Sequence, residues 1–320
     1  MNTYIGNTLQ LYGVEEMRLV GGKADGMRIL RVRNNAGLDF EISLDRCGDI
    51  ARISLKGDNL GYFAPCGYVA PQYYDNKGAG FLKSFTAGFF TTCGLTQVGG
   101  PCEDDGEELP LHGNISHVPC ENFAHWIEGD EIHIRLTVRD ASMFSHQLVL
   151  EREYVCKINE NVLYLTDTVK NIGSRQTPLE LLYHCNMGYP LLSENAIVEI
   201  PCDEVIAKDA LSESGLETRL KMEKPQRGYE EQDFFYKMSG KPTVSIFNPD
   251  IQKSLEMSFD AKELGWVTEW KMMGEFEYVL GLEPGNCVPV GREEMRKSFN
   301  LEFLDPQAEK TFHVTFRFKG

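Results

Sequence analysis

A regular alternation of apolar and polar side chains is the feature of this 320-residue chain that most limits its fold. It is clearest over residues 131–139 (EIHIRLTVR), and it returns over residues 311–318 (TFHVTFRF) near the carboxyl end. Successive side chains of a strand point to opposite faces of a sheet, so this period of two predicts strands with one buried face. Helical signals are sparse, and only residues 14–19 and 260–264 suggest a helical turn.

Further strands are expected on both sides of short polar turns. Residues 27–33 and 38–44 flank a turn at 34–37, residues 148–158 and 162–169 flank another at 159–161, and residues 50–55 end at a turn over 56–59. The pattern predicts an all-β fold, a large antiparallel β-sandwich. We expect a single domain over residues 1–320, because no linker divides the chain.

Charge and cysteine usage exclude several classes of protein. Lys and Arg total 32 against 48 Asp and Glu, and a net charge of -16 opposes binding to nucleic acid or to an anionic membrane. Secretion and membrane insertion are unsupported, because the amino end lacks a signal-peptide pattern and no long apolar run follows. The nine scattered cysteines contain no C-x-x-C pair. We therefore expect a cytoplasmic protein with reduced cysteines, no metal and no organic cofactor.

Three short segments contain candidates for chemistry. His112 precedes Gly113 in the irregular stretch 64–119, which is long enough to shape a binding site. On a strand over 178–186, His184 and Asn186 would share a face, as part of an internal polar network or of a ligand site. Glu283 ends an apolar run, where it either faces water or has its basicity raised by desolvation. The second irregular stretch, 203–241, is interpreted mainly as a solvated surface excursion.

The order of these segments resembles the aldose 1-epimerase, or galactose mutarotase-like, family, within a little-characterised branch. The residues that carry the resemblance are His112-Gly113, His184 and Glu283-Pro284. It implies a β-sandwich of the supersandwich kind and an enzyme that interconverts the anomers of a monosaccharide. By the resemblance, Glu283 takes the proton of the anomeric hydroxyl, His184 protonates the ring oxygen and His112 binds the sugar. Asn186 is expected to bind a sugar hydroxyl, because it shares a strand face with His184.

Departures from the family pattern concern the substrate. The asparagine-arginine pair of the family is missing, and Asp45-Arg46 is the nearest early candidate. The family aspartate falls within residues 228–234, where Glu231 and Asp233 are both open.

Other side chains in the same part of the chain suit a sugar ligand. Trp270 suits stacking on a sugar, and Lys271 suits a carboxylate or sulfonate. Arg292 would add a second positive group, and together with Arg46 these cations make an anionic sugar an option.

Three hypotheses follow for the function. The leading one is an aldose 1-epimerase-like enzyme that acts on a small-molecule sugar. The second is a sugar-binding protein without turnover, and the third is an isomerase or lyase that acts on an unusual or acidic sugar. A homodimer stays open, since symmetric oligomers are common.

Overall fold

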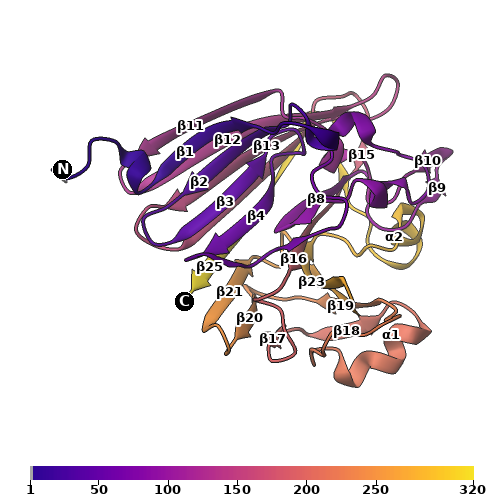
Figure 1. Ribbon diagram of the computed structural model, residues 1–320. Coiled ribbons are helices and arrows are strands. Elements are labelled where there is room, and N and C mark those ends of the chain that lie inside the picture. The colour runs from indigo at the N-terminus through magenta and orange to yellow at the C-terminus, as the bar shows by residue number, and fades with distance from the viewer. Residues whose placement is uncertain (1–2) are drawn as a thin grey trace.

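Three large sheets form most of the computed structural model, which describes residues 3–320 (Figure 1). The five-stranded sheet consists of β1 (Gly13–Arg18), β2 (Arg28–Arg33), β3 (Leu38–Ser43), β4 (Asp49–Leu55) and β5 (Asp58–Asn59). The eight-stranded sheet has the spatial order β11 (Asn122–Glu128), β12 (Glu131–Ala141), β13 (Gln147–Lys157), β14 (Val162–Asn171), β25 (Glu309–Lys319), β21 (Lys253–Phe259), β20 (Thr243–Asn248) and β17 (Ile197–Glu199).

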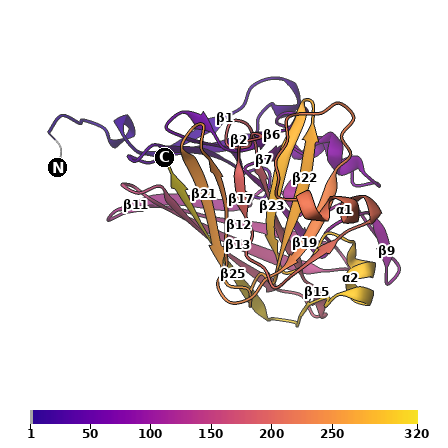
Figure 2. The same ribbon diagram turned by 90° about the horizontal axis from the view of Figure 1, so that it is seen from below.

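The third sheet has six strands and stands at one end of the other two (Figure 2). Its order is β18 (Glu204–Ala207), β19 (Gln232–Lys237), β22 (Trp266–Gly274), β23 (Glu277–Gly285), β16 (Glu180–Met187) and β8 (Phe90–Leu95). Three short pairs complete the strands: β6 (Tyr62–Phe63) with β7 (Ala87–Gly88), β9 (Cys102–Asp104) with β10 (Glu107–Leu109), and β15 (Thr177–Pro178) with β24 (Phe303–Leu304).

Helices are short and lie between the strands. The two α-helices are α1 (Ala210–Gly215) and α2 (Arg292–Ser298). The 3-10 helices are Thr8–Gln10, Gly22–Ala24, Pro71–Tyr73, Gly80–Lys83, Ile115–His117 and Leu216–Thr218. Within residues 3–320, no helix has the length and apolar character needed to cross a bilayer.

The alternating residues form the strands that the sequence predicts. In β12, Ile132, Ile134, Leu136 and Val138 are buried, and the residues between them are partly or fully exposed. The turn between β2 and β3 is also where the sequence places it. Asn34 closes this turn, because its side-chain oxygen accepts the Leu38 backbone N–H at 2.7 Å. The predicted all-β fold with large antiparallel sheets is confirmed.

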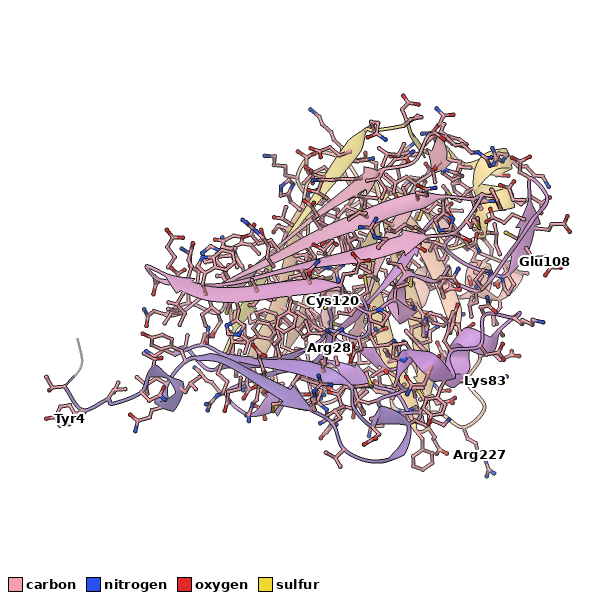
Figure 3. The ribbon with its side chains drawn as sticks, turned by 90° about the horizontal axis from the view of Figure 1, so that it is seen from above. Tyr4, Arg28, Lys83, Glu108, Cys120 and Arg227 are labelled. Atoms are coloured by element: carbon pink, nitrogen blue, oxygen red, sulfur yellow. The ribbon has the colours of Figure 1, made fainter. Side chains whose placement is uncertain are left out.

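One hydrophobic core joins the three sheets. It includes Phe40 of the five-stranded sheet, Leu150 of the eight-stranded sheet and Leu282 of the six-stranded sheet. Figure 3 shows the first two sheets as layers with side chains between them, and Arg28 and Cys120 lie beside each other in that space. The Arg28 guanidinium donates to the Cys120 carbonyl oxygen at 3.0 Å, which links the two layers.

One expectation from the sequence is wrong. Residues 14–19 do not form a helical turn; they lie largely in the edge strand β1, whose pairing with β2 overrides the local pattern. Most residues of 203–241 are exposed, as expected, but the stretch also contains β18, α1 and β19 and so completes the six-stranded sheet. Residues 260–264 do close a single helical turn, with the Leu264 N–H bonded to the Asp260 carbonyl at 3.0 Å.

Candidate active site

The two faces of the six-stranded sheet have different environments. On β16, Tyr183 and Cys185 point into the large core. Because side chains alternate along a strand, His184 and Asn186 point to the opposite face. On β23, Leu280 and Leu282 face the core, so Glu283 lies on the same face as His184. Strand alternation thus gathers the polar side chains on one face of the sheet.

His184 and Glu283 are direct neighbours on this face. The register of β16 against β23 pairs Leu182 with Gly285 and Asn186 with Gly281, so His184 lies opposite Glu283. The distance from His184 Nδ1 to Glu283 Oε1 is 3.0 Å, and both side chains are almost fully buried. A proton donor and a proton acceptor therefore lie side by side.

Asn186 fixes the orientation and the tautomer of His184. The Asn186 amide nitrogen donates to the carbonyl oxygens of Ala87 and His184, at 3.2 and 2.7 Å, so its Oδ1 must face the imidazole. Oδ1 lies 2.8 Å from His184 Nδ1 and can only accept, so Nδ1 carries a proton. This leaves His184 Nε2 to exchange protons with a ligand. Asn186 is fully buried and each of its polar atoms is bonded within the protein, so it orients His184, whereas the sequence led us to expect a contact with a sugar hydroxyl.

Glu283 has a buried oxygen without a hydrogen bond. Its Oε1 contacts His184 Nδ1, but the single Nδ1 hydrogen is directed to Asn186 Oδ1, so the contact is electrostatic. Thr268 lies opposite Glu283 on β22, and its buried hydroxyl also lacks a partner. Buried polar atoms are almost always paired in folded proteins, so two unpaired ones side by side indicate a place for a ligand or for water.

Gly281 provides the space for the Glu283 carboxylate. A Cβ atom at this position would lie 2.3 Å from Glu283 Oε1 and 2.9 Å from the Trp270 Cβ. Both distances are shorter than any van der Waals contact, so no other residue type fits without displacing these side chains. The Glu283 carboxylate therefore occupies the space beside the Gly281 backbone.

His112 approaches the pair from the loop that covers the sheet. Its φ of 56° and the φ of 72° at Gly113 turn the backbone back, and a side chain at Gly113 would come 2.2 Å from the Gly94 carbonyl oxygen. The His112 and His184 rings meet edge to face, with centroids 5.5 Å apart. The Gly99 backbone N–H donates to His112 Nδ1 at 3.3 Å, so the neutral ring carries its proton on Nε2.

Aromatic side chains enclose the two histidines. The Trp270 and Phe85 rings lie 5.2 and 5.1 Å from the His184 ring, and Phe81 lies 5.3 Å from the His112 ring. Trp270 is partly exposed and donates its indole N–H to Glu231 at 2.7 Å, so its face is held in one orientation. Aromatic rings beside polar groups are the usual lining of sites for small polar ligands.

Asp233 extends the polar face of the sheet towards its edge. It lies opposite Trp270 in the β19–β22 register, is buried, and forms an ion pair with Lys208, which follows β18. Of the two acidic candidates, Asp233 therefore lies on the face with Glu283, whereas Glu231 contacts the site through the Trp270 indole. Burial raises the pKa of Asp233 to about 6 against the opposing effect of Lys208.

The two histidines have pKa values that are shifted in opposite directions. Burial acts to lower the pKa of His184, but the Glu283 carboxylate and the hydrogen bond to Asn186 outweigh it, so the pKa lies above its ordinary value of 6.5. Burial and the positive charges of His184 and Lys208 lower the pKa of His112 well below that value. His184 is thus suited to be a charged proton donor and His112 a neutral hydrogen-bond donor.

Arg46 supports the covering loop through most of its N–H groups. Its guanidinium donates to the carbonyl oxygens of Val69, Ser84 and Ser116, at 2.6 to 2.9 Å, and its Nη2 lies 3.0 Å from His117 Nε2. These bonds hold the segment that leads into Phe85. The position of Arg46 indicates that it stabilises the loop, in contrast to the expected contact with the sugar.

Lys271 and Arg292, two of the expected sugar contacts, lie away from the cluster of His184 and Glu283. Lys271 follows Trp270 on a strand and therefore points to the opposite face, where its ammonium donates to the carbonyl oxygens of Thr218 and Lys221. Arg292 begins α2 and is buried in ion pairs with Asp104 and Glu107, at 2.7 and 2.9 Å.

Several residues of the site escaped the sequence analysis. Thr268 could have been found, because it lies two positions before Trp270 and so on the same face of a predicted strand. Lys208, Phe81 and Phe85 lie in segments without periodicity, and nothing local marks them. In the described part of the chain, no three side chains among His, Cys, Asp and Glu are grouped so that they could hold a metal ion.

Comparison with known proteins identifies the family of the chain. A family model described as a domain of unknown function (DUF4432) matches residues 24–318. The chain belongs to this family. No curated protein matches the chain.

Solved structures place this DUF4432 chain among sugar epimerase folds. A "putative aldose 1-epimerase" from Klebsiella pneumoniae is similar to it with a TM-score of 0.91 and 25% identity, over 96% of this chain and 83% of that one. A galactose mutarotase-like protein from Clostridium acetobutylicum has a TM-score of 0.71 and 13% identity, over 97% and 99% of the chains. Galactose 1-epimerase from Lactobacillus acidophilus has a TM-score of 0.66 and 14% identity, over 96% and 99%. The last two similarities concern the fold alone.

Proposed function

We propose that this protein interconverts the α and β anomers of a monosaccharide by opening and closing the sugar ring. The observation that carries the proposal is the buried contact between His184 and Glu283, with His184 Nε2 and the Glu283 carboxylate free of other partners. The two oxygens of a cyclic hemiacetal are bonded to the same carbon. An acid and a base that act on them together must therefore be close neighbours, as these two side chains are.

The proposed reaction transfers one proton at the anomeric hydroxyl and one at the ring oxygen. The Glu283 carboxylate takes the proton of the anomeric hydroxyl, whose oxygen becomes the carbonyl oxygen as the bond from C1 to the ring oxygen breaks. The ring oxygen receives the proton of His184 Nε2. Rotation about the C1–C2 bond presents the other face of the carbonyl, and the reverse proton transfers close the ring.

The protonation states of the free protein suit this direction of transfer. The raised pKa of His184 favours its charged imidazole, and the neighbouring Glu283 carboxylate compensates this charge. His112 stays neutral because its pKa is lowered, so its Nε2–H can donate to a sugar oxygen without competing as an acid. Trp270 supplies an aromatic face against which the sugar carbon skeleton packs.

A neutral sugar suits the charges of the site best. An acidic sugar depended on Arg46, Lys271 and Arg292, and none of these side chains faces Glu283. The cation that does lie near the site, Lys208, is paired with Asp233. This pair offers a donor and an acceptor to sugar hydroxyls, with no excess positive charge for an anion.

The test is exchange NMR on a panel of neutral aldoses, which measures the rate of anomer interconversion directly. Glu283→Gln keeps the size of the side chain but removes the base, so it should slow exchange by about a thousandfold. Glu128→Gln, an exposed position at the end of β11, is the matched control and should exchange as the parent does. Saturable binding of a sugar without exchange in the parent protein would replace the epimerase with a binding protein, the second hypothesis.

We also propose a cytoplasmic location. All nine cysteines are free, including the exposed Cys202, and this is typical of a reducing compartment. Labelling of Cys202 with a thiol reagent in intact cells and in lysates would test it, because a periplasmic or extracellular protein reacts before lysis.

A further inference from the structure

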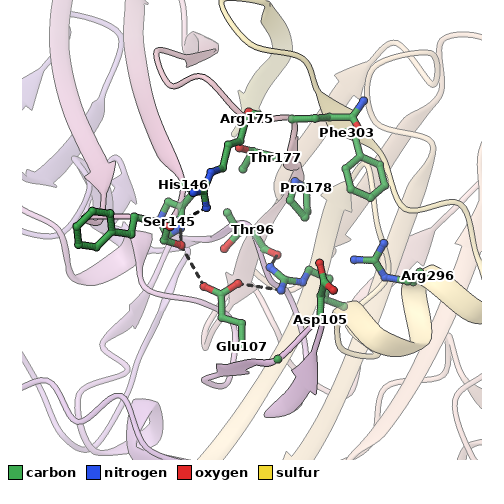
Figure 4. Close-up of a pocket in the computed structure, with 14 residues that line it drawn as sticks. Thr96, Asp105, Glu107, Ser145, His146, Arg175, Thr177, Pro178, Arg296 and Phe303 are labelled. Atoms are coloured by element: carbon green, nitrogen blue, oxygen red, sulfur yellow. Dashed lines mark hydrogen bonds and ion pairs between the residues drawn. The ribbon is translucent and has the colours of Figure 1, made fainter.

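A cavity lined by neither His184 nor Glu283 lies on another part of the molecule (Figure 4). It has a volume of about 470 Å³, which is within the range of small-molecule sites. Its walls come from the β12–β13 turn, the segment before β16, the β9–β10 turn and α2. It shares no residue with the proposed active site.

Three guanidinium groups line this cavity in a protein whose net charge is -16. Arg292 and Arg296 share the Asp104 carboxylate behind the wall, and Arg292 also pairs with Glu107. Arg175 differs from them: within residues 3–320 it makes no ion pair, and its one hydrogen bond is from Nη1 to the Phe144 carbonyl oxygen at 2.9 Å. The side chain of Arg175 can therefore bind an anion without first losing an ion pair.

The acidic side chains of the lining define the rest of the ligand. Glu107 lies across the cavity from Arg175 in Figure 4, and Asp105 lies beside Arg296. A carboxylate accepts hydrogen bonds from hydroxyl groups, so these two residues suit a ligand that carries hydroxyls as well as an anionic group. The hydroxyls of Ser145 and Thr177 add further polar contacts, and the Phe303 ring adds an apolar wall.

The walls are held in place before any ligand arrives. Arg292 is buried, and it bonds to Asp104, Glu107 and the Thr96 carbonyl oxygen. Ser145 donates to Glu107 at 3.4 Å, which connects the β12–β13 turn to the opposite wall. A rigid polar cavity binds a ligand at a lower entropic cost than a mobile one.

We propose that this cavity is a second binding site, for a small hydroxylated anion such as a sugar acid or a sugar phosphate. The anionic group lies against Arg175 and the free N–H groups of Arg296, and the hydroxyls bind Glu107 and Ser145. The proposal does not depend on the epimerase activity, because its test measures binding and no residue of the active site takes part.

The test is calorimetric titration of the full chain with gluconate, glucose 6-phosphate, inorganic phosphate and glucose. We expect saturable binding of at least one of the two hydroxylated anions, and the stronger of the two identifies the anionic group. Arg175→Ala should weaken that binding about tenfold, and Arg175→Lys should restore part of it. Arg317→Ala is the matched control, because this exposed arginine of β25 loses the same charge on another surface.

A variant with the opposite effect separates a site from general charge attraction. Glu107→Gln removes a negative charge that faces the anion but keeps an oxygen for Arg292, so it should strengthen binding of the anion several-fold. If Arg175→Ala and Glu107→Gln bind gluconate and glucose 6-phosphate as the parent does, the cavity is not their site. Binding of glucose alone would also overturn the proposal.

Discussion

Strand β16 has a buried polar cluster on each of its faces, and the two clusters differ in how completely they are hydrogen-bonded. On the core face, Tyr183 donates to Asp167 at 2.9 Å, and Asp167 accepts two bonds from Arg152. On the other face, one residue further along, His184 contacts Glu283, whose Oε1 has no hydrogen bond.

The core cluster is closed. Arg152 is fully buried, and all five of its N–H groups donate, to the Cys47 carbonyl, the Asp49 and Asp167 carboxylates and the Thr92 hydroxyl. Nothing is left for a ligand, so this cluster can only hold the sheets together. The His184 cluster is left incomplete next to aromatic walls. Burial and charge are common to both clusters, so they do not separate a structural cluster from a candidate site; the unpaired oxygen of Glu283 does separate these two.

The largest effect is expected from breaking the closed cluster. Arg152→Met leaves Asp49 and Asp167 buried without their cation, which should lower the free energy of unfolding by about 3–5 kcal/mol. Urea denaturation measures this loss. Arg152→Lys keeps the charge but not the five donors, so its loss should be smaller.

Urea denaturation of Glu283→Gln measures how much the His184 cluster contributes to the free energy of unfolding. This change should cost less than Arg152→Met, because the His184 imidazole can lose its proton when the carboxylate is removed, whereas Asp49 and Asp167 lose a guanidinium that bonds to both. A loss as large as that of Arg152→Met would mean that both clusters are structural.

Much of the fold could be predicted because alternation is a local signal. In β12 the alternation itself shows which side chains are buried, and in the β2–β3 hairpin the polar residues between the strands mark the turn. Strand β1 and helix α1 could not be predicted in this way. The first is fixed by pairing with β2, and the second is a six-residue helix capped by Asp209, which accepts the Ser212 N–H.

The residues of the site could be predicted only where side-chain alternation along a strand or a distinctive motif marked them. His184 and Glu283 follow from parity and from the family pattern. The same alternation argues against Lys271 as a residue of the site, since it follows Trp270 directly and adjacent residues of a strand point to opposite faces of the sheet. Lys208 belongs to the site only because β18 pairs with β19, a contact between residues far apart in the sequence.

Gly281→Ala is expected to displace the Glu283 carboxylate without changing its chemistry. In Gly281→Ala, the new methyl group would overlap Glu283 Oε1 and the Trp270 Cβ, so the carboxylate must shift. We expect anomer exchange to fall about a hundredfold, the cost of displacing a catalytic group by about 1 Å. Gly100→Ala is the control, because a Cβ there meets no atom within 4 Å. Equal exchange rates in the two variants would show that the position of Glu283 is unimportant.

The rate of anomer exchange should depend on pH through His184 and its hydrogen bond to Asn186. The proposed reaction needs a charged His184, so exchange should fall as the pH rises through its pKa, which lies above 6.5. The stability that this raised pKa provides is likewise present below pH 6.5 and is lost as the pH rises through the folded value.

Asn186→Ala removes the acceptor that helps to raise this pKa, so the fall in exchange should move to lower pH, and the rate on the plateau should drop about tenfold. A rate profile from pH 5 to 9 for both proteins measures the shift. A merely structural asparagine would lower the rate at every pH by one factor and leave the midpoint where it is. The midpoint therefore distinguishes an amide that tunes the proton donor from one that only fills space, which is the same distinction that separates the two faces of β16.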